Sequence, residues 1–219
     1  MKPAYPPAPW QLGGWGFATV GLLDATVAAA SLPAGASIVR VVNQKTVGGL
    51  LFASYERGSL VYRELCVVAA LVRVGKRFAF WIPRLYVDDD ASLAGGREIW
   101  GVPKERAEFD VRHDIGVTTV GVRQGATDVC RIRCTVPPRS FRLPTNVPMP
   151  AFGMREGQFL FFSGKLDTRV ATARADVMMS ADGGFAGLGL ERPRFAVRFD
   201  GFSLVVPAPT PSPAPTASA

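Results

Sequence analysis

The sequence predicts a mainly β fold, a closed or nearly closed antiparallel β-barrel with few short helices. Three observations favour it. Ten segments have the composition or alternation of strands, glycines punctuate them at similar spacing, and only two stretches carry helix signals. Many strands with few helices are typical of a barrel or a sandwich, and we expect one such domain.

The ends of the chain differ from its body. Four of the 18 prolines lie in the first nine residues and five lie in the last 13. The last 13 residues carry no charge, no aromatic and no branched apolar side chain, so they have nothing to bury. We therefore expect a proline-rich arm over residues 1–9, a single domain over 10–206 and a disordered tail over 207–219.

The elements follow in chain order. A short helix is predicted over Leu22–Leu32, with Asp24 near its start and Pro33 just past its end. A second is predicted over Ala91–Trp100, capped by Asp90 and ended by a Gly-Val-Pro turn. The predicted strands are Ser37–Val42, Gly49–Tyr55, Ser59–Val74, Arg77–Val87, Ala107–Ile115, Val117–Gln124, Thr127–Val136, Gln158–Leu166, Ala171–Met179 and Phe195–Val205.

Composition argues against several classes of partner. The net charge is +7, but the arginines are spread singly from Arg40 to Arg198, so we expect no nucleic-acid partner. A single histidine, His113, rules out a multi-histidine metal site. No apolar run reaches the 18 residues of a membrane span, and Asp24 interrupts the one stretch that resembles a signal peptide. We therefore expect no membrane association and a cytoplasmic location.

A glutamate lies in an apolar row of the predicted strand 59–74. Glu64 shares its parity with Tyr62, Cys66 and Val68, so an unbroken strand turns it toward the interior. A buried carboxylate needs a partner, an altered pKa or a wet pocket. Two alternatives remain open, a bulge that turns Glu64 to solvent and a buried ion pair with an arginine such as Arg97.

The segment 95–105 is the least generic part of the chain. It reads Gly-Gly-Arg-Glu-Ile-Trp-Gly-Val-Pro-Lys-Glu, and Pro103 presents Lys104 in a well-defined position because proline fixes its own φ and restricts the residue before it. With Tyr62-Arg63-Glu64, Tyr86-Val87-Asp88 and Ala107 in the same order and spacing, the chain resembles the acetoacetate decarboxylase family, most clearly from Val47 to Phe109.

The resemblance implies a fold and a site. It implies an acetoacetate decarboxylase-like β-barrel, homo-oligomeric assembly, and a Schiff base between Lys104 and a small keto acid. Glu64 matches a family active-site glutamate, whereas Arg97 and Glu98 would pair to hold the lysine loop. The protonated imine is itself the electron sink, so no metal or organic cofactor is implied. A desolvating pocket, which favours the neutral amine, could come from Leu51, Tyr62 and Trp100.

Two positions depart from the family pattern. Glu105 stands where the decarboxylases carry a second lysine, and Trp15 aligns loosely with an arginine that handles the substrate carboxylate. Relatives with altered pockets use the same lysine for aldol condensation and dehydration, for which Glu64 or Glu105 could shuttle protons. The expected function is thus a carbon–carbon lyase of either kind. The alternative is a non-catalytic barrel that binds a small carbonyl or hydrophobic ligand.

Overall fold

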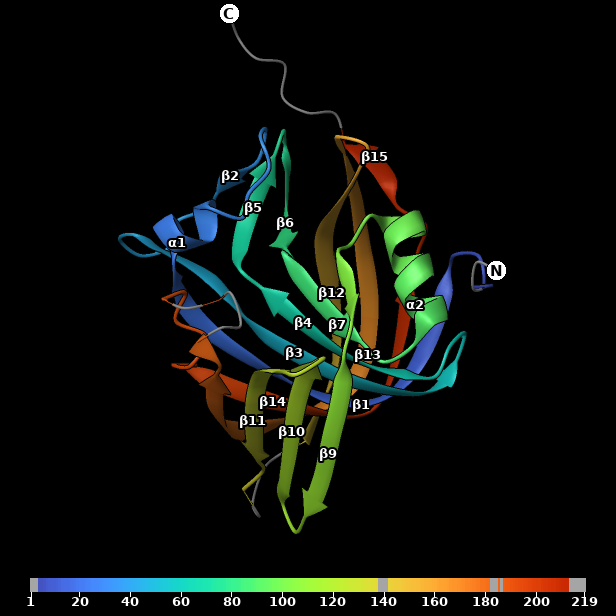
Figure 1. The fold of residues 1–219 in the computed structure, drawn as a ribbon, viewed down its shortest axis with the longest axis vertical. Coiled ribbons are helices and arrows are strands. Elements are labelled where there is room, and N and C mark those ends of the chain that lie inside the picture. The colour runs from blue at the N-terminus through green and yellow to red at the C-terminus, as the bar shows by residue number, and fades with distance from the viewer. Residues whose placement is uncertain (1–3, 138–141, 182–184, 186, 213–219) are drawn as a thin grey trace, which may run out of the picture.

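The structure is a computed structural model that describes residues 4–137, 142–181, 185 and 187–212. Strands dominate it (Figure 1). The helices are α1 (Ala25–Ala29), α2 (Asp90–Gly95) and the π-helical turn η1 (Gly96–Trp100). The strands are β1 (Trp10–Asp24), β2 (Ser37–Ile38), β3 (Lys45–Gly58), β4 (Tyr62–Val68), β5 (Ala70–Val74), β6 (Arg77–Trp81), β7 (Arg84–Val87), β8 (Lys104–Arg106), β9 (Glu108–Asp114), β10 (Val117–Gln124), β11 (Thr127–Thr135), β12 (Arg142–Arg155), β13 (Gln158–Met179), β14 (Phe195–Val206) and β15 (Thr210–Ser212).

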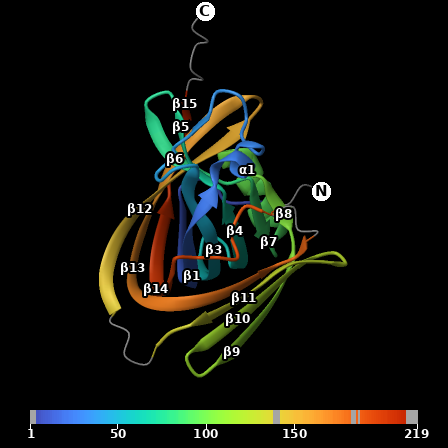
Figure 2. The same cartoon turned by 90° about the vertical axis from the view of Figure 1, so that its left-hand side faces the viewer.

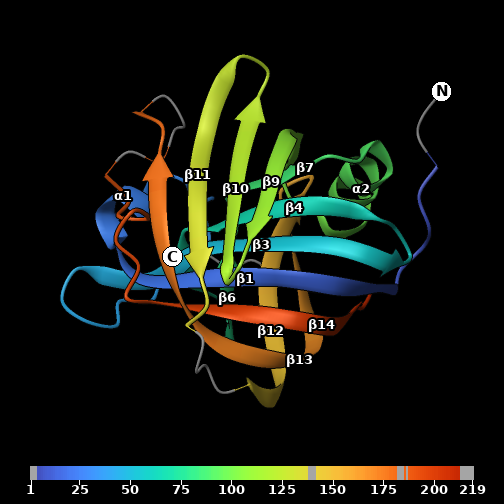
Figure 3. The same ribbon diagram turned by 90° about the horizontal axis from the view of Figure 1, so that it is seen from below.

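One path of hydrogen-bonded strands runs β2-β5-β6-β12-β13-β14-β1-β3-β4-β7-β8. The long strand β13 also pairs with β11, which carries the β9–β10–β11 meander. Figures 1 and 2 show this meander projecting from one end of the molecule, and Figure 3 shows it from below. Helix α2 packs beside β7 and β8 at the end of the main path.

The sheet does not close into the predicted barrel. In the described chain the path ends at β2 on one side and at β8 on the other, and these two strands do not pair. The physical reason lies at β8, which is only three residues long. Beyond Ala107 the chain enters β9, which pairs with β10 in the meander. The predicted mainly β class is confirmed, and the predicted closure into a barrel is wrong.

Apolar side chains pack in two clusters. The first contains Phe17, Phe52, Leu65 and Phe152, all completely buried. The second, which we call the lysine-side core, contains Trp10, Tyr55, Tyr62, Cys66 and Trp100, among others. Strand β4 contributes alternate residues to both clusters, so it is buried on both faces. A side chain on the lysine-side face of β4 is therefore enclosed by aromatic rings.

The predicted strand 59–74 is interrupted, but not at Glu64. Strands β4 and β5 are separate, and between them the Ala69 N–H donates to the carbonyl of Trp81. Residues 65, 67 and 69 lie in the first cluster, as do residues 70, 72 and 74, so the parity changes at this break. The apolar row predicted along the strand 59–74 is therefore wrong beyond Val68, although it holds around Glu64.

The first helix is shorter than predicted, whereas the second helical stretch covers the predicted residues as an α-helix followed by a π-helical turn. Strand β1 continues to Asp24, whose carboxylate caps α1 by accepting from the N–H groups of Thr26 and Val27. The second helix is capped by Asp89 rather than Asp90, and it changes to η1 at Gly96. No helix of the described residues is long and apolar enough to cross a bilayer.

The C-terminal tail is partly structured. Strand β15 pairs antiparallel with residues 159–161 of β13, and the Arg77 guanidinium donates to the Thr210 hydroxyl at 2.8 Å. The disordered tail predicted from residue 207 is therefore wrong for residues 210–212, because the backbone of Thr210–Ser212 finds an edge to pair with despite its composition. Residues 213–219 of that tail, and residues 1–3 of the arm, lie outside the described residues.

Candidate active site

Lys104 is held in place by its backbone. Gly101 ends η1 in the left-handed conformation at φ 66°, and Lys104 then begins β8, paired with Leu85 of β7. The Lys104 N–H donates to the carbonyl of Val102 at 2.8 Å, and the Arg97 guanidinium donates to the carbonyl of Lys104 at 2.8 Å. The loop thus fixes the backbone of Lys104 from both sides.

Glu64 reaches the same point from β4. Strand β7 lies between β4 and β8, with Glu64 opposite Val87 and Lys104 opposite Leu85. The Nζ atom of Lys104 lies 2.8 Å from Oε2 of Glu64, and their side chains are only 5% and 11% exposed. Glu64 is therefore buried as the alternation predicts. Its ion-pair partner is Lys104, not Arg97.

The ammonium group of Lys104 has a partner for each of its three protons. It donates to Glu64 Oε2 and Ser92 Oγ at 2.8 Å each and to the Tyr62 hydroxyl at 3.3 Å. It also lies over two aromatic rings, 4.8 Å from the centre of Tyr62 and 5.6 Å from that of Trp10. Such rings stabilise a cation on their faces. The group is thus enclosed by one carboxylate, two hydroxyls and two aromatic faces.

Two tyrosines complete the surroundings of the carboxylate. Tyr55 donates to Oε1 of Glu64 at 3.2 Å and Tyr62 donates to Oε2 at 3.3 Å. Burial, reinforced by the nearby Glu64 charge, holds the pKa of each hydroxyl well above its ordinary value. Both phenols therefore stay protonated and act as donors. Tyr62 contacts both charges and so connects the lysine and the glutamate.

Ser92, Tyr55 and Trp10 are site residues that the sequence reasoning missed. Ser92 is completely buried on α2, and its N–H donates to Asp89 at 2.6 Å. A serine in the first turn of a helix is commonplace, so nothing in the sequence marked it. A signal did exist for Tyr55, because a hairpin turning at Gly58 places Tyr55 opposite Tyr62 and on the same face as Glu64.

Two further predicted pocket residues, Trp100 and Leu51, pack in or against the lysine-side core. Trp100 forms a second layer, with its ring edge-on to Trp10 at 4.7 Å and its indole N–H on the carbonyl of Pro207. Leu51 packs against the lysine-side core from β3, opposite Cys66. Neither is among the hydrogen-bonding partners of Lys104.

Two predicted pocket residues face away from Lys104. Trp15 packs against the other apolar cluster, and its indole donates to Glu56 at 2.8 Å. Its assignment to the pocket is wrong, because it lies on the opposite face of the sheet from Lys104. Glu105 also points away, because successive side chains of a strand alternate. It pairs with Arg84 at 3.1 Å and accepts from Gln124.

Arg97 and Glu98 both hold the lysine loop, through separate contacts. Arg97 binds the carbonyl of Lys104, and Glu98 accepts a hydrogen bond from the hydroxyl of Tyr5. Tyr5 belongs to the N-terminal arm. In the same arm, the carbonyl of Pro6 accepts a hydrogen bond from the indole N–H of Trp10. The arm thus contributes to the packing around the site.

Comparison with known proteins points to one family. The family model for acetoacetate decarboxylase matches residues 2–162. Among curated proteins, "Protein NEOXANTHIN-DEFICIENT 1" of Solanum lycopersicum is 30% identical over 106 residues, and "Acetoacetate decarboxylase 3" of Mesorhizobium japonicum is 40% identical over 50. The matched regions span 48% and 23% of this chain but only 36% and 19% of those proteins.

Solved structures show the same fold. Acetoacetate decarboxylase from Legionella pneumophila superposes with a TM-score of 0.72 at 16% identity, over 96% of this chain and 90% of that one. The enduracididine biosynthesis enzyme MppR, complexed with pyruvate, gives 0.72 at 14% identity, over 96% and 93%. Because the family model covers most of the sequence and the fold agrees along it, the chain belongs to the acetoacetate decarboxylase family.

Proposed function

We propose that this chain is a Schiff-base enzyme that acts on a small keto acid, with Lys104 as the nucleophile and Glu64 as the acid/base. The observation that carries the proposal is the enclosed Lys104 ammonium, held 2.8 Å from a buried carboxylate and over aromatic rings. An amine on a rigid loop, with a proton acceptor within hydrogen-bond reach, has the parts that imine formation needs.

The chemistry begins with a proton transfer. Glu64 accepts a proton from the Lys104 ammonium, and the neutral amine then attacks the carbonyl carbon of the substrate. The carbinolamine loses water when its hydroxyl receives a proton from Glu64, and a protonated imine remains. Tyr62 contacts both groups and can orient the amine during the attack. Because all three N–H donors of Lys104 are engaged, at least one of these contacts must break as substrate enters.

The residues around Lys104 favour aldol and dehydration chemistry over decarboxylation. The residue after the lysine is an acid, and it points away from the ammonium toward Arg84. Position 105 therefore supplies no second cation. A cation there would favour the neutral form of the Lys104 amine and would offset the charge of a substrate carboxylate. A carboxylate flanked by two phenols instead offers repeated proton transfer, which enamine formation, aldol addition and dehydration all require.

Trapping the imine tests the proposal. The protein is incubated with pyruvate or acetoacetate, reduced with borohydride, digested and analysed by mass spectrometry. We expect the mass of the reduced adduct on Lys104, and its loss in Lys104→Arg. Lys76→Arg is the matched control, because Lys76 is an exposed lysine in the turn between β5 and β6. Adducts on Lys76 at a similar level would overturn the assignment.

Product analysis then separates the two reactions. Pyruvate supplied with an aldehyde should yield an aldol or dehydrated product, with little carbon dioxide from acetoacetate. Release of carbon dioxide at the higher rate would identify a decarboxylase. Failure to trap any keto acid on Lys104 would favour the alternative, a non-catalytic chain that holds a small carbonyl or hydrophobic ligand in the lysine-side core.

A further inference from the structure

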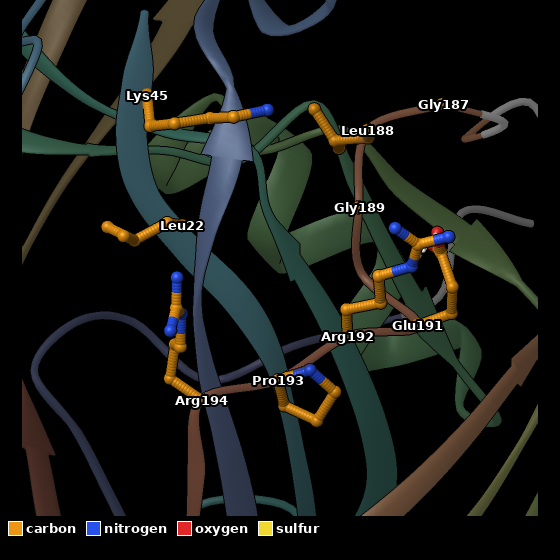
Figure 4. Close-up of a pocket in the computed structure, with 9 residues that line it drawn as sticks. All are labelled: Leu22, Lys45, Gly187, Leu188, Gly189, Glu191, Arg192, Pro193 and Arg194. Carbon is orange, nitrogen blue, oxygen red and sulfur yellow. Dashed lines mark ion pairs between the residues drawn. The ribbon is translucent and has the colours of Figure 1, made fainter. Parts of the chain in front are cut away.

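A hollow lies away from Lys104, between the end of β1, the start of β3 and the loop that leads into β14 (Figure 4). It has a volume of about 610 Å³ and is lined by Leu22, Lys45 and the segment 187–194 apart from Leu190. None of the residues that contact the Lys104 ammonium belongs to its lining. It is therefore a separate cavity that the proposed function does not use.

The lining carries more positive than negative charge. Lys45, Arg192 and Arg194 come from two distant parts of the sequence, against the single carboxylate of Glu191. Figure 4 shows the Lys45 side chain extending toward Leu188, the Arg194 side chain pointing toward Leu22, and Arg192 beside Glu191. The three cationic groups thus lie on different sides of the same hollow.

These charges are only partly neutralised. Lys45 pairs with Asp24 at 3.2 Å, and the other oxygen of Asp24 is occupied in capping α1. Arg192 lies 4.0 Å from Glu191, which is longer than a hydrogen bond. Arg194 has no carboxylate partner within the described residues. At least two guanidinium groups are therefore available to an incoming anion.

The loop that carries the arginines is anchored. Leu188 and Leu190 are buried in the first apolar cluster, and the Asp24 N–H donates to the carbonyl of Leu188 at 3.1 Å. The Arg194 N–H donates to the carbonyl of Val20 at 2.8 Å. These anchors fix the backbone on both sides of Arg192, so a bound anion would order the side chains without first having to order the loop.

We propose that this hollow binds a small organic phosphate. A guanidinium fork matches the geometry of a phosphate and donates two parallel hydrogen bonds to it. Arg194 and Arg192 would bind the phosphate oxygens, Lys45 would add charge, and the organic part would rest on Leu22 and Pro193. Such a ligand leaves the imine chemistry of Lys104 untouched, so the two proposals are independent.

Binding measurements test this site with simple probes. Phenyl phosphate, inorganic phosphate, benzoate and phenol are titrated by calorimetry at constant ionic strength. We expect phenyl phosphate to bind most tightly, and Arg194→Gln or Arg192→Gln to weaken its binding about tenfold or more, because hydrogen bonds to charged groups are stronger than those between neutral groups. Glu191→Gln should tighten binding because it removes the one carboxylate that lines the hollow.

The control variant is Arg112→Gln, an exposed arginine on β9 that pairs only with its neighbour Asp110 among the described residues. It should bind phenyl phosphate like the parent protein, and so should Lys104→Arg. Equal weakening in Arg112→Gln and Arg194→Gln would mean nonspecific charge attraction and would overturn the site. Benzoate binding as tightly as phenyl phosphate would overturn the phosphate assignment, and loss of binding in Lys104→Arg would place the ligand elsewhere.

Discussion

At the scale of single residues, the central feature is a buried ion pair between β4 and β8. Removing one member of such a pair leaves the other charge buried without compensation, which typically costs about 3–5 kcal/mol, whereas replacing both can be nearly neutral. The two tyrosines and Ser92 lower that cost only in part. Each makes a hydrogen bond to one of the charged groups, but none of these hydroxyls is itself charged. Lys104 and Glu64 should therefore be strongly coupled.

A double-mutant cycle measures this coupling. We expect Lys104→Met and Glu64→Gln each to lower the free energy of unfolding by roughly 3 kcal/mol, and the double variant to lose clearly less than the sum. Guanidinium unfolding followed by circular dichroism gives the four values. Additive losses would show that the pair is not energetically linked.

Gly96 has a role that the sequence did not reveal. Its φ of −61° suits any residue, but a Cβ atom there would lie 2.5 Å from Cδ and 2.6 Å from Cε of Lys104. The absence of a side chain thus gives the lysine stem its path to Glu64. We expect Gly96→Ala to displace the Lys104 ammonium from Glu64, to reduce imine trapping at least tenfold and to lower the free energy of unfolding, because the buried pair is disturbed. Normal trapping in this variant would contradict the packing argument.

The cysteine thiols predict a pH dependence of stability. Burial raises the pKa of Cys130 from 9.0 to about 12. The unfolded chain therefore loses this proton at a lower pH than the folded one, so stability falls as pH rises from 9 toward 12, by about 1.4 kcal/mol per unit. Cys130→Ala should show a shallower decline over that range in denaturant titrations. Identical slopes in both proteins would refute the assignment.

Site residues could be predicted from the sequence only where the pattern that marks them lies within one strand or one motif. Glu64 could be placed because its alternation is local, and Lys104 because a rigid Val-Pro step precedes it. Trp10 reaches the ammonium from the start of β1, far away in the chain, and Ser92 reaches it from the first turn of α2, 12 residues before the lysine. No local pattern encodes such contacts, and so neither residue could be chosen from the sequence.

At the scale of elements, strands with no more than one interior glycine and no proline were recognised from their alternation. Val117–Gln124 was predicted with its observed bounds, whereas β1 and β12 were missed. Strand β1 contains four glycines, two of which pack against backbone of β3 where a Cβ atom would collide. Strand β12 contains three prolines, and it pairs with β6 at only two positions, so most of it is an edge that tolerates them.

The tail strand β15 predicts a sharp difference between two truncations. Ending the chain after Val206 removes β15, the hydrogen bond from Arg77 to Thr210 and the one from Trp100 to Pro207. We expect this to lower the free energy of unfolding by about 1–3 kcal/mol and to increase hydrogen exchange around Trp100. Ending it after Ser212 should leave both unchanged. Equal behaviour of the two truncations would show that β15 contributes nothing.

At the scale of the whole molecule, the periodicity of the sequence predicted the class of fold but not which strands form the two edges of the sheet. Alternation says which residues face a core, whereas closure depends on whether the last strand of a path meets the first. Here the terminal strands β2 and β8 are two and three residues long, too short to carry a pattern. The homo-oligomeric assembly implied by the family stays a prediction, which light scattering on the purified protein would test.

The N- and C-terminal parts of the domain are joined in the middle of the sheet. Strand β14 lies between β13 and β1, with ten residue pairs on the β1 side. Residues of β13 and β1 enter both apolar clusters or pack against them, and those of β14 enter the lysine-side core. The main path is therefore continuous only when β14 is in place, and most of its long-range pairing must form together, as is typical of slow, cooperative β folds.

Removing β14 should consequently abolish folding rather than weaken it. A chain that ends after Arg194 leaves β13 and β1 each with an unpaired edge and removes Phe199 and Phe202, which are buried in the lysine-side core. We expect no cooperative thermal transition and no imine trapping at Lys104, although β8 and its loop remain in the chain. The truncation after Ser212 is the matched control. A cooperative transition in the shorter chain would mean that the β1–β8 half folds independently of the strand that completes the sheet.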